Sequence, residues 1–410
     1  MRTKLVFIFF FFPYFSHAGE ILTWKDCLQL AAQNNAELKS QEYVVNSSRA
    51  AVQAARSGYF PQLSADLSYN KSDINDPSYS AGLTASQNLF AGFQDVGKVE
   101  QAQANFKEAE AALDLTKAKI SFDLKSAFEG LHFSKEYQTF TAGVTHRREE
   151  NLNLVRLRFQ SGQENKGSVL LSKAYLEQAH YEEMQSHHAV QSAQTTLQKE
   201  LGLESFEGKD IQGEVTLSDP PTAPNFQELA TATPDYRQAK SQESSAQSAI
   251  TIAKSQFFPS LNLTASSGKI GPDFFPDSEN HWSVGVGLSF PLFDGGKDYY
   301  GVQKSTALWS SAIAARQNLS HELLIKIQTA YTSFVETIAK LKVDQSFQQA
   351  ATVRADIARN KYNNGLLSFD DWDKIESDLI LRQKNYLQSK RDRIIAEAAW
   401  EQAQGKGAIP

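Results

Sequence analysis

Residues 60–70 of this 410-residue chain read Phe-Pro-Gln-Leu-Ser-Ala-Asp-Leu-Ser-Tyr-Asn, and this stretch decides the fold. After Pro61, apolar and polar side chains alternate strictly, which is typical of a β-strand with one apolar and one polar face. The same start returns as Phe258-Pro259-Ser260-Leu261, about 198 residues later, and opens a second alternating run. A repeat of that length indicates that a large unit has been duplicated.

Two further motifs repeat in the same order, each at an offset of about 203 residues. Leu89-Phe90-Ala91-Gly92 returns as Leu292-Phe293-Asp294-Gly295, and Arg158-Phe159-Gln160-Ser161-Gly162 returns as Lys361-Tyr362-Asn363-Asn364-Gly365. The order of motifs predicts the same elements in both units: a leading helix, two strands, a long helix, a glycine turn and a returning helix.

These repeats divide the chain into defined parts. Arg2 and Lys4, the apolar run at 5–12 and the small residues of Ser16-His17-Ala18 form the three parts of a secretory signal peptide, so residues 1–18 are expected to be removed. The remaining boundaries are a first unit at 19–207, a proline-containing linker at 208–224, a second unit at 225–404 and a tail at 405–410.

A second alternating run completes a pair of strands in each unit. Its apolar positions are Tyr79, Ala81, Leu83, Ala85 and Leu89 in the first unit and Trp282, Val284, Val286, Leu288 and Phe290 in the second. Each run has about 9–10 residues, the length of a tilted membrane-crossing strand. The pattern alone fits an ordinary half-buried hairpin equally well. Aromatic residues at the strand ends would suit interfacial girdles: Tyr69, Tyr79, Trp282 and Phe290.

The helix lengths give a geometric constraint. Heptad spacing predicts long helices from about Gln94 to Phe159 and from about Asp298 to Tyr362, each roughly 100 Å long. Shorter helices of about half that length are expected before the strands and after the glycine turns. Laid end to end, two short helices match one long one. Rods of this length cannot enclose a globular core alone, so we expect association with other copies.

Composition excludes several classes of function. The net charge of −6 and the pI of about 5.8 argue against a protein that wraps nucleic acid. A single cysteine excludes an intrachain disulfide framework. No nucleophile elbow, phosphate loop or dinucleotide fingerprint occurs in the required context, so we expect neither an enzyme nor a cofactor. His180, His187 and His188 share one helix at spacings that favour a solvated face over a metal site.

The paired Phe-Pro-x-Leu strand starts, Leu-Phe-Asp-Gly-Gly at 292–296 and Lys-Tyr-x-x-Gly at 361–365 resemble the TolC-like outer membrane efflux proteins. The resemblance covers the whole mature chain. It implies a mainly α-helical homotrimer in which four strands from each protomer close a 12-stranded β-barrel in the outer membrane. A coiled-coil α-helical barrel would continue it through the periplasm. The resemblance also implies a passive duct of a tripartite efflux or type I secretion system, docked on a periplasmic adaptor (membrane fusion) protein and an inner-membrane pump.

The resemblance implies roles for residues at the two glycine turns, which would form the periplasmic tip. The expected adaptor contacts are Arg158, Gly162, Lys361 and Gly365. Asp371 matches an aspartate that lines the periplasmic entrance in the family, and Asp370 or Asp373 would share that role. From the residues alone, Ser368 with Asp371 also reads as a helix-capping box. The alternative function is a periplasmic coiled-coil adaptor or tether that never enters a membrane.

Overall fold

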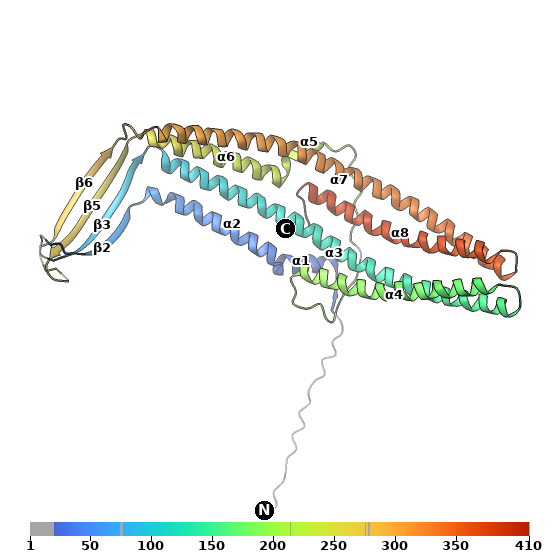
Figure 1. The fold of residues 1–410 in the computed structure, drawn as a ribbon. Helices are drawn as coiled ribbons and strands as arrows, with labels where there is room; N and C mark the ends of the chain where they lie inside the picture. Colours follow the sequence, from blue (N-terminus) through green and yellow to red (C-terminus); the bar gives the residue numbers. More distant parts are fainter. Residues whose placement is uncertain (1–19, 74–76, 214, 275, 278, 410) are drawn as a thin grey trace, which may run out of the picture.

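The molecule is elongated, with strands at one end and helical rods along the rest of its length (Figure 1). The computed structural model describes residues 20–73, 77–213, 215–274, 276–277 and 279–409. The predicted signal peptide at 1–18 lies outside the described residues. No helix in the described ranges combines the length and apolar composition that a membrane-crossing segment needs.

The described helices are α1 (Trp24–Asn34), α2 (Ala36–Ala55), α3 (Gln94–Gln160), α4 (Lys166–Leu201), α5 (Phe226–Ala232), α6 (Pro234–Lys254), α7 (Lys297–Asn363) and α8 (Phe369–Ala403). The strands are β1 (Glu20–Leu22), β2 (Gln62–Asn70), β3 (Ser78–Ala91), β4 (Lys209–Ile211), β5 (Ser260–Gly271) and β6 (His281–Ser289). Short 3₁₀ turns, η1 (Arg56–Tyr59) and η2 (Ser255–Phe257), precede β2 and β5. The expected fold class, mainly α with a small β part, is confirmed.

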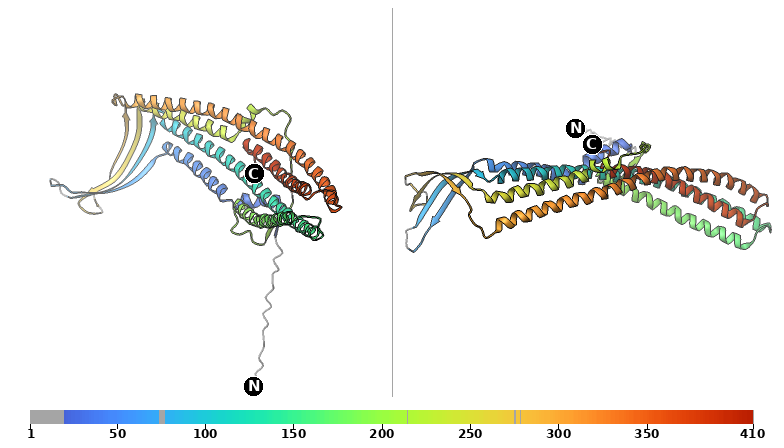
Figure 2. Two further views of the ribbon diagram at one scale, coloured as in Figure 1. Left: turned by 45° about the vertical axis from the view of Figure 1, so that its right-hand side comes forward. Right: turned by 90° about the horizontal axis from the view of Figure 1, so that it is seen from above.

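The long helices α3 and α7 each contain 67 residues, and their ends lie within one residue of the bounds predicted from the heptad spacing. Near the sheet the rods lie side by side in the order α7, α6, α3, α2, and towards the opposite end in the order α7, α8, α3, α4 (Figure 1). Each long helix is therefore flanked by two half-length helices. Seen from above, the rods form a curved layer instead of a closed bundle (Figure 2).

The leading helix of each unit is interrupted, which the sequence analysis did not predict. Asn35 ends α1 and caps α2, because its Oδ1 accepts hydrogen bonds from the backbone N–H groups of Glu37 and Leu38. In the second unit, Thr233 caps α6, and Pro234 occupies the first turn of that helix. A proline at this position has no N–H to lose, so it starts a helix without breaking one.

The sheet joins both units in the antiparallel order β2-β3-β5-β6. Paired residues point to the same face, so the register separates the two kinds of side chain. One face carries Leu63, Leu67, Val286 and Leu288, and the other carries hydroxyl groups such as Ser68 and Ser80, whose Oγ atoms lie 2.7 Å apart. The alternation predicted from the sequence thus becomes one apolar and one polar face.

The main hydrophobic cluster lies where the half-length helices meet, near the middle of the rods. It combines α1, α3 and α4 through Cys27, Ile120, Phe128 and Leu197, all with 0% exposure. Ile409 of the tail joins this cluster. The three-residue strands β1 and β4 pair in parallel beside it, a pairing too short for alternation to predict.

Replacing Asn35 with alanine is expected to destabilise the chain by about 2–3 kcal/mol. The change removes the cap of α2 and leaves the carbonyl of Glu200, which accepts from Asn35 Nδ2 at 3.1 Å, without that partner. Asn35→Asp is the matched control, because it keeps the capping oxygen and loses only the donor. Thermal unfolding followed by circular dichroism should give the highest midpoint for wild type, a lower one for Asn35→Asp and the lowest for Asn35→Ala. Equal midpoints would contradict the capping role.

Candidate functional site at the helical tip

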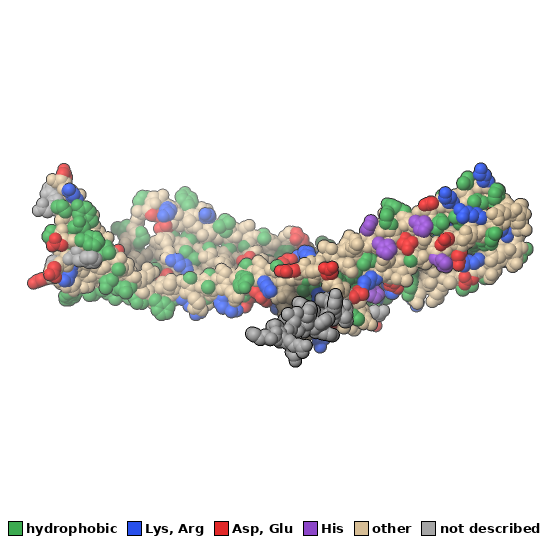
Figure 3. Space-filling view, turned by 90° about the horizontal axis from the view of Figure 1, so that it is seen from below, with side chains coloured by type: hydrophobic (Ala, Val, Ile, Leu, Met, Phe, Trp, Pro, Cys, Tyr) green, Lys and Arg blue, Asp and Glu red, His purple; other side chains and the backbone are tan. Residues whose placement is uncertain are grey.

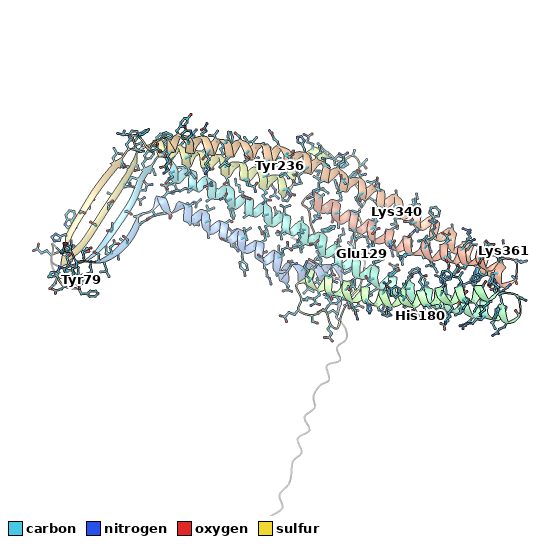
Figure 4. The ribbon with its side chains drawn as sticks, viewed as in Figure 1. Tyr79, Glu129, His180, Tyr236, Lys340 and Lys361 are labelled. Carbon is cyan, nitrogen blue, oxygen red and sulfur yellow. The ribbon has the colours of Figure 1, made fainter. Side chains whose placement is uncertain are left out.

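Two glycine turns form the end of the molecule opposite the sheet (Figure 1). Gly162 and Gly365 have φ angles of +73° and +74°, a backbone conformation that favours glycine. The backbone N–H of Leu366 donates to the carbonyl of Lys361 at 2.8 Å and closes the second helix end. Both turns are thus glycine helix caps. Gly162, Lys361 and Gly365 are exposed at this end, where Figure 4 labels Lys361.

Arg158, which is expected to contact the adaptor, also ties the two turns together within the single chain. Its Nη1 donates to the backbone carbonyl of Tyr362 at 2.6 Å, and its guanidinium lies 4.6 Å from the centroid of the Tyr362 ring. These contacts join α3 to α7 across 204 residues of sequence. The side chain is only partly exposed. These contacts hold the two turns together. A partner protein would contact the part of the Arg158 side chain that stays exposed.

Tyr362 is the buried centre of the tip. It has 0% exposure, and its ring stacks on Trp372 at 4.3 Å with an interplanar angle of 10°. Its hydroxyl donates to Glu164 Oε2 at 3.1 Å. Burial, followed by the charge of Glu164, raises the pKa of Tyr362. The phenol therefore stays neutral and acts as a hydrogen-bond donor between the second unit and the turn of the first.

The structure separates the three aspartates expected at the entrance. Asp371 is exposed, and the Ser368 hydroxyl accepts a hydrogen bond from the Asp371 backbone N–H and donates one to the Asp371 carboxylate, which confirms Ser368 as the N-cap of α8 without the reciprocal backbone bond of a capping box. Asp370 is also exposed. Asp373 is partly buried and accepts a hydrogen bond at 2.9 Å from Arg148 Nη1. The three carboxylates therefore differ in exposure and partner: Asp370 and Asp371 are exposed, whereas Asp373 is held by Arg148.

Arg148 is a site residue that the sequence analysis missed. Its side chain lies between α3, α4 and α8: Nη2 donates to Ser377 Oγ at 3.0 Å, and the guanidinium lies 4.6 Å from the Tyr175 ring centroid. Its exposed fraction is only 8%. The sequence could have indicated that Arg148 is buried, because it lies on the same face of α3 as the buried residues Val144 and Val155.

Glu376 forms a second polar junction one turn away from Asp373. Its carboxylate is 1% exposed, and Oε1 lies 3.8 Å from Arg147 Nη1 of α3 and 3.6 Å from Arg359 Nη2 of α7. Burial lowers the pKa of Arg147. The buried carboxylate of Glu376 therefore lies near two partly exposed arginines, and the three side chains link α8 to α3 and α7.

The predicted girdle residues fall at two levels of the sheet. The rings of Tyr69 and Tyr79 lie 4.8 Å apart at the end far from the helices, where Figure 4 labels Tyr79. Trp282 lies in β6 opposite Ser267, towards the same end. Phe290 follows the last residue of β6, at the end next to the helices. The set therefore spans the height of the strands.

The histidines do not assemble into a metal centre. Histidine side chains gather on one face of the half of the molecule that leads to the tip (Figure 3). His180, His187 and His188 of α4 are exposed, and His187 Nδ1 lies 2.6 Å from Gln138 Nε2. Within the described ranges, no three His, Cys, Asp or Glu side chains are placed to hold a metal ion.

Three features define a TolC-like channel fold. They are a sheet with one apolar and one polar face, long helices each flanked by two half-length helices, and a tip formed by two glycine turns. The sequence profile of the family described as outer membrane efflux protein matches residues 27–203 and 225–406. The chain therefore belongs to the outer membrane efflux protein family, which confirms the resemblance found in the sequence. This family consists of outer-membrane channels and not of enzymes, which favours the duct over the adaptor or tether.

Individual relatives are similar over nearly the whole chain. The solvent efflux pump outer membrane protein SrpC of Pseudomonas putida is 23% identical over 93% of this chain and 84% of its own length. The crystal structure of CusC aligns with a TM-score of 0.84 and 17% identity over 93% of this chain and 92% of CusC. The open state of the Neisseria gonorrhoeae MtrE channel aligns with a TM-score of 0.83 and 18% identity over 96% and 93%.

Proposed function

We propose that three copies of this chain form a passive export duct of a tripartite efflux or type I secretion system, gated at its periplasmic tip. The observation that carries the proposal is a sheet with two unlike faces and two open edges. On one face, Leu63 and Leu288 are 74% and 71% exposed in the single chain. Large apolar side chains in such numbers call for a lipid or protein neighbour.

The opposite face of the sheet suits water. Its side chains are mostly serine, threonine, asparagine and glycine, and the Oγ atoms of Ser266 and Ser283 lie 2.8 Å apart. A closed sheet of this kind would place the apolar face towards lipid and the polar face around a lumen. The girdle residues Tyr69, Tyr79, Trp282 and Phe290 would then lie near the two membrane interfaces.

The edge strands β2 and β6 are exposed along all nine of their residues. Their unpaired backbone groups would be costly in a bilayer unless another chain completes the sheet. Three protomers with four strands each would supply the 12 strands that the resemblance implies. The helical layer below would close in the same way into a tunnel.

The tip is proposed to dock on a periplasmic adaptor and to regulate passage. Gly162, Lys361 and Gly365 are exposed at the outermost turns, where a partner can reach them. The contacts of Arg148, Arg158 and Glu376 hold α3 to α7 and α8, so opening would require these contacts to break. The name of SrpC, a solvent efflux pump component, supports an inner-membrane pump as a further partner.

Purification from outer membranes followed by mass determination and planar-bilayer recording tests this proposal. A threefold assembly that conducts ions would support it. A soluble monomer without conductance would contradict the duct and support the adaptor or tether.

Replacing Asp371 with alanine is expected to weaken cation selectivity or block by multivalent cations by about two- to fivefold. Three copies of this exposed carboxylate around a threefold axis would attract cations at the entrance. Asp219→Asn, which removes an exposed carboxylate from the segment between β4 and α5, far from the tip, is the matched control for charge. The reversal potential under a salt gradient measures the change, and an unchanged value would exclude Asp371 from the entrance.

A further inference from the structure

The polar face of the sheet carries two titratable side chains. Within β2, β3, β5 and β6, all of whose residues the structure describes, they are Asp66 of β2 and His281 of β6. The other residues on this face are neutral, and most of them are serine, threonine, asparagine and glycine. Lys269 of β5 lies opposite Ala81 and therefore on the apolar face. The charge of the polar face is thus set by Asp66 and His281 alone.

The strand register places these two residues in one row across the sheet. Asp66 lies opposite Gly82, Gly82 lies opposite Gly268, and Gly268 lies opposite His281. The row therefore has a side chain at each end and none between. Three strand spacings, about 14 Å in total, separate its two ends.

Close packing of the strands keeps the middle of this row free of side chains. An added Cβ at Gly268 would lie 2.8 Å from the Ala81 carbonyl oxygen and 2.9 Å from Gly82 Cα. A larger residue at Gly268 would therefore push β5 away from β3. With glycine in both central positions, no side chain screens Asp66 from His281 or either of them from the space above the sheet.

The surroundings of Asp66 are polar and neutral. The Asp66 side chain is exposed, and its Oδ2 accepts a hydrogen bond from Ser64 Oγ at 3.3 Å. The two adjacent rows place hydroxyl residues beside it, namely Thr84 opposite Ser64 and Ser80 opposite Ser68. The carboxylate of Asp66 can therefore act on ions that pass along this face.

His281 is exposed at the first position of β6, at the end of the sheet far from the helices (Figure 1). Its paired strand is β5, where Gly268 lies opposite and the nearest charge, Lys269, belongs to the other face. Asp277 and Glu279 precede it in the chain, and Lys269 Nζ lies 4.0 Å from Asp277 Oδ1. Histidine is the side chain that ordinarily changes charge between pH 5 and 8.

We propose that Asp66 and His281 form a charged row that determines the ion selectivity of the strand part of the duct. The inference rests on the proposed function, which places the polar face around a lumen, and it specifies residues that act on the passing ions. Three copies supply three carboxylates and three imidazoles. With neutral imidazoles the row is negative and favours cations. On acidification three imidazolium charges balance three carboxylates, so the preference for cations falls.

The ionic strength decides how clearly this effect can be measured. The Debye length is about 10 Å at 0.1 M salt and about 30 Å at 0.01 M. Charges about 14 Å apart are thus largely screened at the higher concentration. Reversal potentials across a planar bilayer should therefore be recorded with the dilute side at about 0.01 M potassium chloride.

Replacing Asp66 with asparagine is expected to lower the ratio of cation to anion permeability by about twofold or more at pH 8. The two side chains have nearly the same shape, and position 66 is exposed, so the strand should fold as before. Lys269→Gln is the matched control, because it removes a charge from the apolar face of the same sheet. Its permeability ratio should equal that of wild type.

The second variant, His281→Gln, tests the other end of the row. In wild type the permeability ratio should fall between pH 8 and pH 5, and in His281→Gln at least half of that fall should disappear. At pH 5 the single variant Asp66→Asn keeps three uncompensated imidazolium charges, so its ratio should lie below that of the double variant Asp66→Asn/His281→Gln. Native mass in detergent verifies that each variant assembles.

The outcomes distinguish this inference from the proposed function. A lower ratio in Asp66→Asn together with a weaker pH dependence in His281→Gln supports the charged row. A conducting assembly in which either variant behaves as wild type, or in which Lys269→Gln changes the ratio, overturns the row and leaves the duct standing. A wild-type protein that does not conduct ions overturns both.

Discussion

The substitution Arg148→Ala is expected to open the proposed gate at the tip and to raise the single-channel conductance of the proposed trimeric duct by about tenfold or more. Arg148 makes two charge-assisted hydrogen bonds to α8 and stacks over Tyr175 of α4. Each such hydrogen bond contributes about 1.5–3 kcal/mol, and about 1.4 kcal/mol corresponds to a tenfold change in an equilibrium. Their loss in every protomer should therefore shift the tip strongly towards separated helix pairs.

Planar-bilayer recording of the purified protein measures this effect. Arg148→Lys keeps the charge but not the paired geometry, so an intermediate conductance is expected. Arg156→Ala removes an exposed arginine from the same helix and should leave the conductance unchanged. Wild-type conductance in Arg148→Ala, with the assembly intact, would show that these contacts do not hold the tip closed.

The fold was predictable from the sequence where a pattern extended over many residues. The alternation of apolar and polar residues over 62–70 and the heptads along α3 persist long enough to outweigh local exceptions. Because the unit is duplicated, each pattern also occurs in the second half of the chain. The interruption at Asn35 was not predictable in this way. It depends on a hydrogen bond to the carbonyl of Glu200, which lies 165 residues away in the sequence.

The tip residues could be predicted in position but not in their contacts. Gly162 and Gly365 follow from helix ends and a left-handed backbone, which are local properties. By contrast, Asp373 finds its partner 225 residues away, and Arg158 finds Tyr362 at a separation of 204. Three neighbouring aspartates look alike in sequence, and only the packing of α3 on α8 distinguishes Asp373 from Asp370 and Asp371.

The substitution Gly365→Arg is expected to abolish export while the proposed trimer still forms. An added Cβ at Gly365 would meet only Arg158 Nη2, at 3.9 Å, so the side chain has room but brings a like charge to the tip. The φ of +74° adds about 1–2 kcal/mol of backbone strain to any residue with a Cβ. Both effects act on the outermost turn, at the end of the molecule opposite the strands.

Export is measured in a host that lacks the wild-type gene, as susceptibility to a panel of toxic compounds, and assembly is measured by native mass in detergent. Gly365→Ala separates the two effects, because alanine carries the backbone strain of the left-handed conformation and adds neither bulk nor charge. We expect Gly365→Ala to retain most of the export and Gly365→Arg to lose it, since the bulky charge blocks the surface that a partner would contact. Full export by Gly365→Arg would remove this turn from the docking site, whereas loss of the trimer would show that the tip also governs assembly.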